Sequence, residues 1–188
     1  MAQIVFLDTN VMLDYLENRN QEVRDVIAQL LLYHKKGRIV LATSVFNVAE
    51  IIDKEFEIHF MGWCLNERMS FDEISSRRRD EKLFKEISEK NKNSIEKRIK
   101  DFIFKNNMIL FTFSGENPQY KELYDLIYQR QLQSQDALVV ATALANKVTY
   151  FLSNDSNLTS KIGEMLDTYN LRDEGLRKAF RDAVLEAT

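Results

Sequence analysis

The chain has 188 residues, a length typical of a single domain, and 45% of them are hydrophobic, which is enough to bury a substantial core and excludes a disordered chain. Its formal net charge of −3 gives no support to nucleic-acid binding through bulk positive charge. One cysteine and two histidines exclude a disulfide framework and a Cys/His zinc site. The single Cys64 fits a reducing compartment, and no apolar run approaches the roughly 20 residues that cross a bilayer, so we expect a soluble, cytoplasmic protein.

Four short apolar runs predict β-strands, in chain order at Ile4–Leu7, Ile39–Ala42, Met108–Phe113 and Val148–Leu152. They lack polar alternation, which is typical of strands covered on both faces, as in a parallel sheet between helices. Between the first two strands, apolar residues at helical spacing predict a helix over 11–32 with a break near 18–20. Further helices are expected to begin near Val45, Asn117 and Asp136. Strands that alternate with helices predict an α/β fold with a mainly parallel sheet.

The segment between the second and third strands has a different composition. From Trp63 to Ser114 it contains no Gly or Pro, and Ser70 and Glu73 have the spacing of a helix capping box. Apolar residues from Phe84 to Phe102 follow one another at helical intervals, with charged residues between them. We therefore predict a single domain over residues 1–188 with a charged helical insertion at about 57–107. A C-terminal helix is expected at about 171–187, and no strand is assigned after the fourth.

Four acidic residues stand where strands and helices meet at one end of the predicted sheet. Asp8 and Asp155 follow the first and the fourth strand, Glu50 lies in the helix after the second strand, and Asp136 opens a helix. In an open α/β sheet, ligands bind beyond the carboxyl ends of the strands, so we expect all four carboxylates to converge there. The polar residues beside them could orient waters or substrate oxygens; these are Asn10, Ser44, Asn47 and Ser153.

Carboxylates that converge in a partly buried site repel one another, and a divalent cation relieves that repulsion. A ligand set made only of oxygens favours Mg²⁺ or Mn²⁺, which suits phosphate chemistry because the cation neutralises charge on a phosphodiester. Taken singly, Asp8, Asp136 and Asp155 are more simply explained as helix caps or turn residues. Glu50 differs, because it lies among apolar neighbours and a charge in such surroundings needs a partner. The metal-site hypothesis therefore depends on the four acids taken together.

The segments "FLDTNVMLDYL", "TSVFNVAEI", "SQDALVVATALA" and "FLSNDSNL" together resemble the PIN-domain family, and specifically VapC-type toxins. They cover roughly residues 3–56 and 108–160. The resemblance implies a three-layer α/β/α fold in which one or two Mg²⁺ or Mn²⁺ ions are held by Asp8, Glu50, Asp136 and Asp155. It also matches the polar motif positions of the family to Asn10, Ser44, Asn47 and Ser153.

The activity that this resemblance implies is endoribonuclease cleavage of single-stranded RNA. Proteins of this kind are commonly homodimers and are commonly paired with an inhibitory antitoxin protein. The spacing between Glu50 and Asp136 exceeds that of compact toxins, and the predicted helical insertion accounts for the difference.

Two other functions compete with this interpretation. A phosphatase of the haloacid-dehalogenase type also begins with a strand that ends in Asp, but it needs a second Asp at the position of Asn10. A non-catalytic or weakly catalytic PIN-fold module for RNA or protein binding is the second alternative. The arginines of "SSRRRD" are better explained by a solvated helix surface, and the tyrosines at 120, 124 and 128 by core or dimer packing, although both groups could contact RNA.

Overall fold

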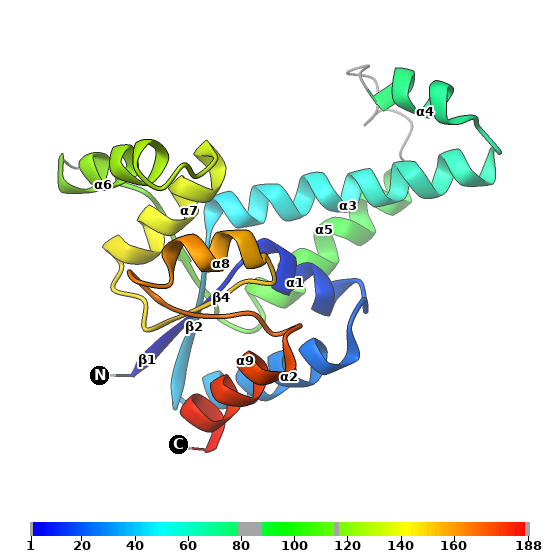
Figure 1. Ribbon diagram of the computed structural model, residues 1–188. Coiled ribbons are helices and arrows are strands. Elements are labelled where there is room, and N and C mark those ends of the chain that lie inside the picture. The colour runs from blue at the N-terminus through cyan, green and yellow to red at the C-terminus, as the bar shows by residue number, and fades with distance from the viewer. Residues whose placement is uncertain (1, 79–87, 115–116, 187–188) are drawn as a thin grey trace.

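Figure 1 shows the protein as a computed structural model, in which residues 2–78, 88–114 and 117–186 are described. Five strands form one parallel sheet in the order β3-β2-β1-β4-β5. Their bounds are Gln3–Leu7 for β1, Ile39–Ser44 for β2, Ile109–Phe111 for β3, Tyr150–Leu152 for β4 and Asp167–Tyr169 for β5. The chain turns to opposite sides of β1 when it forms β2 and β4, and α/β sheets bind ligands at such a switch point.

Helices cover both faces of this sheet and also extend away from it (Figure 1). Their bounds are Thr9–Leu16 for α1, Gln21–Lys35 for α2, Val45–Asn66 for α3, Phe71–Arg78 for α4, Glu89–Ile103 for α5, Asn117–Tyr128 for α6, Ser134–Ala145 for α7, Ser156–Ile162 for α8 and Glu174–Phe180 for α9, which continues as the π-helix η2 over Arg181–Glu186. None of the helices in the described ranges is long and apolar enough to cross a membrane.

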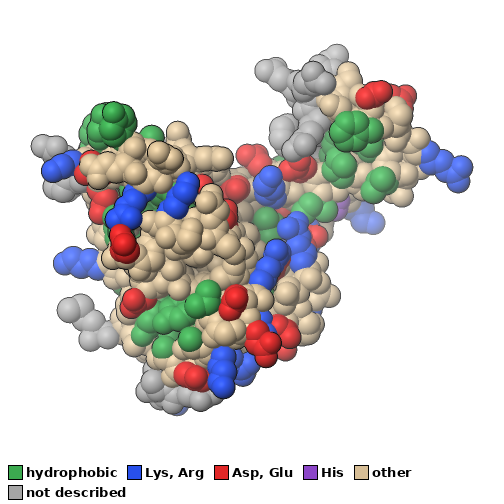
Figure 2. Space-filling model, viewed as in Figure 1, with side chains coloured by type: hydrophobic (Ala, Val, Ile, Leu, Met, Phe, Trp, Pro, Cys, Tyr) green, Lys and Arg blue, Asp and Glu red, His purple; other side chains and the backbone are tan. Residues whose placement is uncertain are grey.

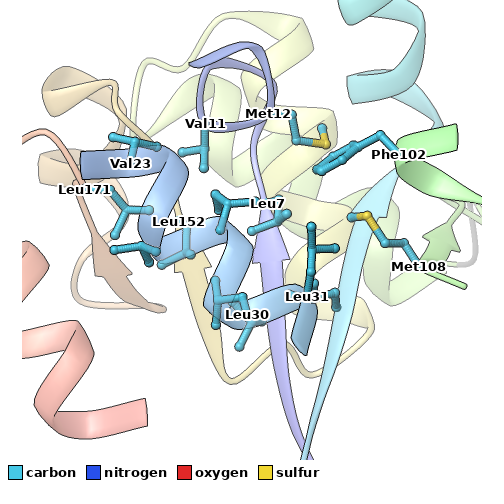
Figure 3. Close-up of a cluster of buried hydrophobic side chains, with 14 of the residues drawn as sticks. Leu7, Val11, Met12, Val23, Leu30, Leu31, Phe102, Met108, Leu152 and Leu171 are labelled. Carbon is cyan, nitrogen blue, oxygen red and sulfur yellow. The ribbon is translucent and has the colours of Figure 1, made fainter. Parts of the chain in front are cut away.

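The core consists of two hydrophobic clusters, one on each face of the sheet. In β1, Val5 and Leu7 contribute to the first cluster and Phe6 to the second, because successive side chains of a strand point to opposite faces. The first cluster includes residues of α1, α2, α3, α5 and α9, and the second includes residues of α6, α7 and α8. Figure 3 shows part of the first cluster, with Val11 and Met12 of α1, Val23, Leu30 and Leu31 of α2, and Phe102 of α5. The ring of Phe6 stacks on that of Phe151 at 5.2 Å between centroids. The predicted three-layer α/β/α architecture with a parallel sheet is therefore confirmed.

The charged segment forms a helical arm that projects from the sheet. In Figure 1, α3 and α5 run side by side away from the sheet, and α4 lies at the far end. The predicted capping box starts α4, because Glu73 accepts a hydrogen bond of 2.8 Å from the backbone N–H of Ser70. The helix α3 is continuous from Val45, so one helix carries both Glu50 and the near half of the arm. Phe84, which we assigned to the arm helix, lies outside the described residues.

Several bounds differ from the sequence-based expectations, among them β4, which begins at Tyr150 rather than at Val148. A fifth strand, β5, completes the sheet, but it is a short edge strand with a half-buried pattern and so leaves no apolar run in the sequence. β3 covers only Ile109–Phe111 of the predicted Met108–Phe113, because it is the opposite edge strand and pairs with β2 over a short register. The C-terminal helix begins at Glu174, where Asp173 caps it by accepting a hydrogen bond of 2.8 Å from the N–H of Leu176.

Candidate active site

The candidate site lies at the carboxyl ends of β1, β2 and β4. The register that pairs Leu7 with Leu152 continues one residue further, so Asp8 and Ser153 lie side by side after their strands. The backbone N–H of Asp8 donates a hydrogen bond of 3.0 Å to Leu152 O, which extends the ladder to this point. Asp8 is also the N-cap of α1, Ser44 that of α3, and Asp155 that of α8. Each of these three residues therefore has a structural role in addition to any chemical one.

All four predicted carboxylates line one pocket, which has a volume of about 320 Å³. The acidic residues of its wall are Asp8, Glu50, Asp136 and Asp155, and the remaining lining residues are Thr9, Asn10, Leu13, Arg19, Lys54 and Leu158. These residues come from the loop between α1 and α2 and from α1, α3, α7 and α8, elements that are far apart in the chain. The convergence that the sequence predicted is thus present in the structure.

Asp8 is the most buried of the four acids, at 7% exposure. Its Oδ1 accepts hydrogen bonds from the Thr9 backbone N–H at 2.8 Å and from Asn47 Nδ2 at 2.9 Å. Its Oδ2 accepts one of 2.6 Å from the hydroxyl of Ser153. Burial raises the pKa of Asp8 to about 6, helped by the charges of Glu50 and Asp136, although the hydrogen bonds from Ser153 and Thr9 oppose the rise.

The other three carboxylates differ in their hydrogen bonds and in how their neighbours affect them. Burial, and then the negative charges of Asp155 and Glu50, raise the pKa of Asp136, while Lys161 opposes this rise. Glu50 has the partner that its apolar surroundings demand, because its Oε2 accepts a hydrogen bond of 2.7 Å from the hydroxyl of Thr9. Asp155 accepts hydrogen bonds from the N–H groups of Asn157 and Leu158 at 2.8 and 3.1 Å. The electrostatic repulsion inside the pocket is therefore only partly relieved by neutral donors.

The four predicted polar residues bind to the acids or to one another. Asn47 reaches Thr9 Oγ1 at 3.0 Å in addition to Asp8, and Ser44 contacts Asn47 both as the helix cap and through their side chains. Asn10 Nδ2 donates a hydrogen bond of 3.2 Å to Ser153 Oγ. Of the four, only Asn10 lines the pocket, so Ser44, Asn47 and Ser153 lie behind the carboxylates rather than facing a substrate.

The donor set of the pocket suits a hard divalent cation in part. In the ranges that the structure describes, no three His, Cys, Asp or Glu side chains are grouped closely enough to hold a metal ion by themselves. Mg²⁺, however, is usually bound through one or two carboxylates and keeps several waters. The pocket offers oxygen ligands and uncompensated negative charge, which match that mode of binding, with Asp8, Glu50, Asp136 and Asp155 as the candidate ligands.

The structure also shows an ion pair beside the site, between a buried aspartate and a half-exposed arginine, that we did not predict from the sequence. Asp14 on α1 has no exposed surface, and Arg172 holds its two oxygens from Nε at 2.7 Å and from Nη2 at 2.6 Å. Asn154 Nδ2 donates to the same carboxylate at 2.8 Å, and its backbone N–H donates to Asn10 Oδ1 at 2.8 Å. A continuous chain of hydrogen bonds therefore connects Arg172 to the pocket. The signal for Asp14 was the one used for Glu50, a charge inside an apolar run, "VMLDYL".

Two lining cations, Arg19 and Lys54, were also missed, because neither belongs to a motif. The basic and aromatic groups that we did consider lie elsewhere. Arg77 of "SSRRRD" stacks over the ring of Trp63 at 5.3 Å, which agrees with a surface role, while Arg79 lies outside the described residues. Tyr120, Tyr124 and Tyr128 are 63%, 57% and 73% exposed, so the prediction that they pack in the core was wrong. Hydrophobic side chains gather at α6, at the upper left of Figure 2.

No protein-family model matches the chain, and no curated protein sequence matches it significantly. Solved structures do match. VapBC2 from Rickettsia felis, in a crystal structure with a DNA fragment from their promoter, matches with a TM-score of 0.55 at 15% identity, over 88% of this chain and 97% of that chain. VapBC-1 from nontypeable Haemophilus influenzae matches with a TM-score of 0.55 at 15% identity, over 91% and 100% of the two chains.

A third structure, FitAcB from Neisseria gonorrhoeae, matches with a TM-score of 0.53 at 16% identity, over 89% of this chain and 98% of that chain. At such low identities the likeness concerns the fold. Two of these three neighbours are VapBC proteins, the group that the sequence motifs indicated. The resemblance to VapC-type PIN domains is therefore confirmed at the level of the fold, and the chain has a PIN-like α/β/α fold with an added helical arm.

Proposed function

We propose that this protein is a Mg²⁺- or Mn²⁺-dependent endoribonuclease that hydrolyses phosphodiester bonds in single-stranded RNA. The observation that carries the proposal is the pocket in which Asp8, Glu50, Asp136 and Asp155 meet at the switch point of the sheet. Burial raises the pKa values of Asp8 and Asp136, and the charges of the neighbouring acids raise them further, which supports a site that a counterion would stabilise. The absence of Asp at position 10 argues against the phosphatase alternative.

The residues of the pocket divide the work in this proposal. A bound divalent cation would neutralise charge on the phosphodiester. Three hydrogen bonds hold the Asp8 carboxylate, and the hydroxyl of Thr9 holds that of Glu50. These two acids would therefore position the cation. The Asp136 side chain makes no hydrogen bond within the described part of the chain, so it is the carboxylate with the most freedom to contact the cation or to accept a proton from the attacking water.

We further propose that the protein is the toxin of a toxin–antitoxin pair. This extension rests on the fold shared with VapBC and FitAcB structures, and it implies a protein partner that masks the pocket or the arm. A homodimer and a cytoplasmic location belong to the same proposal.

The alternative is a PIN-fold module that binds RNA or protein with little or no catalysis. It is favoured by the finding that the described acids form no group of three in ligating contact. The long arm of α3 and α5 would then be the main interaction surface. This alternative predicts binding without hydrolysis, which a cleavage assay detects directly.

The deciding experiment incubates the purified protein with end-labelled single-stranded RNA in Mn²⁺, in Mg²⁺ and in EDTA. Asp136→Asn is the preferred inactive variant, because this side chain holds no hydrogen bond in the described ranges and its loss leaves the fold intact. Asp167→Asn is the matched control, with the same charge change at the amino end of the edge strand β5. Metal-dependent cleavage that only Asp136→Asn abolishes supports the proposal. Equal cleavage in EDTA, or by Asp136→Asn, contradicts it.

A further inference from the structure

We infer that Arg19 and Lys54 form a phosphate-binding subsite beside the acidic pocket and hold the backbone of single-stranded RNA next to the bond that is cut. This inference rests on the proposed function and adds the residues that recognise its substrate. Both cations line the pocket that contains the four carboxylates. A phosphodiester that approaches four acids needs positive charge on the protein as well as a metal ion, and within the described chain these two side chains are the cations of the pocket wall.

The backbone places Arg19 at the rim of the pocket. Arg19 lies in the tight loop between α1 and α2, where Asn18 has a positive φ of 57°, a conformation that Asn tolerates better than most residues. The backbone N–H of Arg19 donates a hydrogen bond of 3.1 Å to Asp14 O, and Asn20 caps α2 by accepting one of 3.0 Å from Val23 N. Hydrogen bonds therefore fix the loop at both ends, and they hold the backbone of Arg19 at the rim of the pocket.

The Arg19 guanidinium is available for a ligand. Glu17 and Glu55 lie near enough for the charge of Arg19 to act on both. Both carboxylates nevertheless pair with Arg98 from α5, through Nη1 and Nη2. The Arg19 side chain itself makes no hydrogen bond or ion pair in the ranges 2–78, 88–114 and 117–186. An exposed guanidinium with its fork of N–H donors free is suited to bind two oxygens of a phosphate.

Lys54 is placed by the helix that also carries Glu50. The two residues are four apart on α3, so they lie on the same face and one turn from each other. The ion pair of Lys54 is with Glu57 at 3.2 Å, where the two side chains are 48% and 30% exposed. Exposed pairs of this kind contribute little stability, so Lys54 can exchange Glu57 for a phosphate. A lysine serves here as a point charge beside the more directional arginine.

The two cations and two of the acids come from different elements of the pocket wall. Arg19 and Lys54 come from the α1–α2 loop and from α3, whereas Asp136 and Asp155 come from α7 and α8. The pKa of Asp136 responds to Lys161 among the cations, whereas those of Glu17 and Glu55 respond to Arg19. A strand of RNA would thus pass over the side where α3 leaves for the arm, with the reacting phosphate above the acids.

The test measures binding rather than cleavage. A fluorescent single-stranded RNA oligonucleotide is titrated with the full-length Asp136→Asn protein at several KCl concentrations, with and without Mn²⁺. Arg19→Gln, Lys54→Gln and the double variant are compared in this background with Lys178→Gln, an exposed lysine of α9 outside the pocket. Each lost phosphate contact is expected to weaken binding and to make the slope of log affinity against log salt shallower by about 0.7. Lys178→Gln should leave both quantities unchanged.

The outcomes separate this inference from the proposed function. RNA binding with unchanged affinity and slope in Arg19→Gln and Lys54→Gln overturns the subsite, even where the wild-type protein cleaves RNA. Binding that depends on both cations supports the subsite, even where no cleavage is found. A poly-glutamate peptide that binds as tightly as the RNA, with the same dependence on Arg19 and Lys54, overturns the assignment to nucleic acid.

Discussion

The hydroxyl of Ser153 donates a hydrogen bond of 2.6 Å to Oδ2 of Asp8, although 145 positions separate the two residues in the chain. The same oxygen of Ser153 accepts hydrogen bonds from Asn10 Nδ2 at 3.2 Å and from the backbone N–H of Asp155 at 3.1 Å. One buried hydroxyl therefore joins the ends of β1 and β4 and fixes two of the four acids relative to each other. The site depends on this residue for its shape.

Replacement of Ser153 by alanine should destabilise the fold. The substitution removes a donor to a buried carboxylate, and a hydrogen bond to a charged group contributes about 1.5–3 kcal/mol to the free energy of unfolding. Denaturant unfolding of Ser153→Ala at neutral pH measures the loss. Ser160→Ala is the control, because its exposed hydroxyl donates a local hydrogen bond to the carbonyl of Asn157 within α8, and the change should cost less than about 0.5 kcal/mol. Equal losses in the two variants would contradict the role assigned to Ser153.

The Asp8 carboxyl should titrate near pH 6 in the metal-free protein, well above the ordinary value of 3.8. Below pH 3.8 the folded and the unfolded chain both carry the proton, so the raised pKa has no effect on stability. Between pH 3.8 and 6 the unfolded chain releases this proton first, so stability falls as pH rises. Above pH 6 the free energy of unfolding is lower by the full amount, about 3 kcal/mol, that the buried charge of Asp8 costs.

A divalent cation should remove that penalty, because it favours the ionised carboxylate. The pKa of Asp8, followed by ¹³C NMR of its carboxyl carbon, should fall when Mg²⁺ is added. The thermal midpoint should rise with Mg²⁺ at pH 7.5 and change little at pH 5. A metal-free titration near pH 4 would show that the burial of Asp8 does not act as described.

Replacement of Asp136 by asparagine should stabilise the metal-free protein. The substitution removes a half-buried charge that Asp155 and Glu50 repel, and it breaks no hydrogen bond among residues 2–78, 88–114 and 117–186. The gain in the free energy of unfolding at pH 7 is expected to be about 1 kcal/mol, in the range found when strained functional residues are replaced. The comparison is the thermal midpoint of Asp136→Asn and Asp167→Asn in EDTA. A clear loss of stability in the first would mean that Asp136 supports the fold.

The pair of Asp14 and Arg172 should matter more than an ion pair on the surface. The Asp14 carboxylate is fully buried whereas the Arg172 side chain is 48% exposed, so Arg172→Gln is expected to cost more than the loss of a surface pair but less than the roughly 3–5 kcal/mol typical of a wholly buried pair, with Asn154 still donating to Asp14. Asp14→Asn in the same chain should restore part of the loss, which a double-mutant cycle measures. Arg130→Gln is the control, because Arg130 and Glu164 are 40% and 80% exposed and such pairs contribute about 0–1 kcal/mol.

The sequence predicted the centre of the fold better than its edges. β1 and β2 are buried on both faces and therefore appear as uninterrupted apolar runs, whereas β5 is a half-exposed edge strand without such a run. The four acids were predictable because Asp8, Asp136 and Asp155 follow or begin an element of the parallel sheet's layers, and Glu50 lies in the helix directly after β2. That argument uses only the order of strands and helices in the sequence, so it applies to residues whose position the sheet determines.

Contacts between distant segments could not be predicted in this way. The charge of Asp14 inside an apolar run indicates that it needs a partner, but nothing in the neighbouring sequence indicates Arg172, which is 158 positions away. The same holds for Glu55, which Arg98 reaches from the returning helix of the arm. Arg19 reaches the pocket through the shape of one short loop, and loop shape leaves little trace in hydrophobic periodicity.

Calorimetric titration of the metal-free protein with Mn²⁺ at pH 7 tests the central claim most directly, because it measures the shared metal site without reference to any RNA. We predict saturable binding to the wild-type protein and to Asp167→Asn, with affinity reduced about tenfold or more in Asp136→Asn. Absence of Mn²⁺ binding in the wild-type protein, or equal affinity in Asp136→Asn, would contradict the claim that these four carboxylates form a metal site.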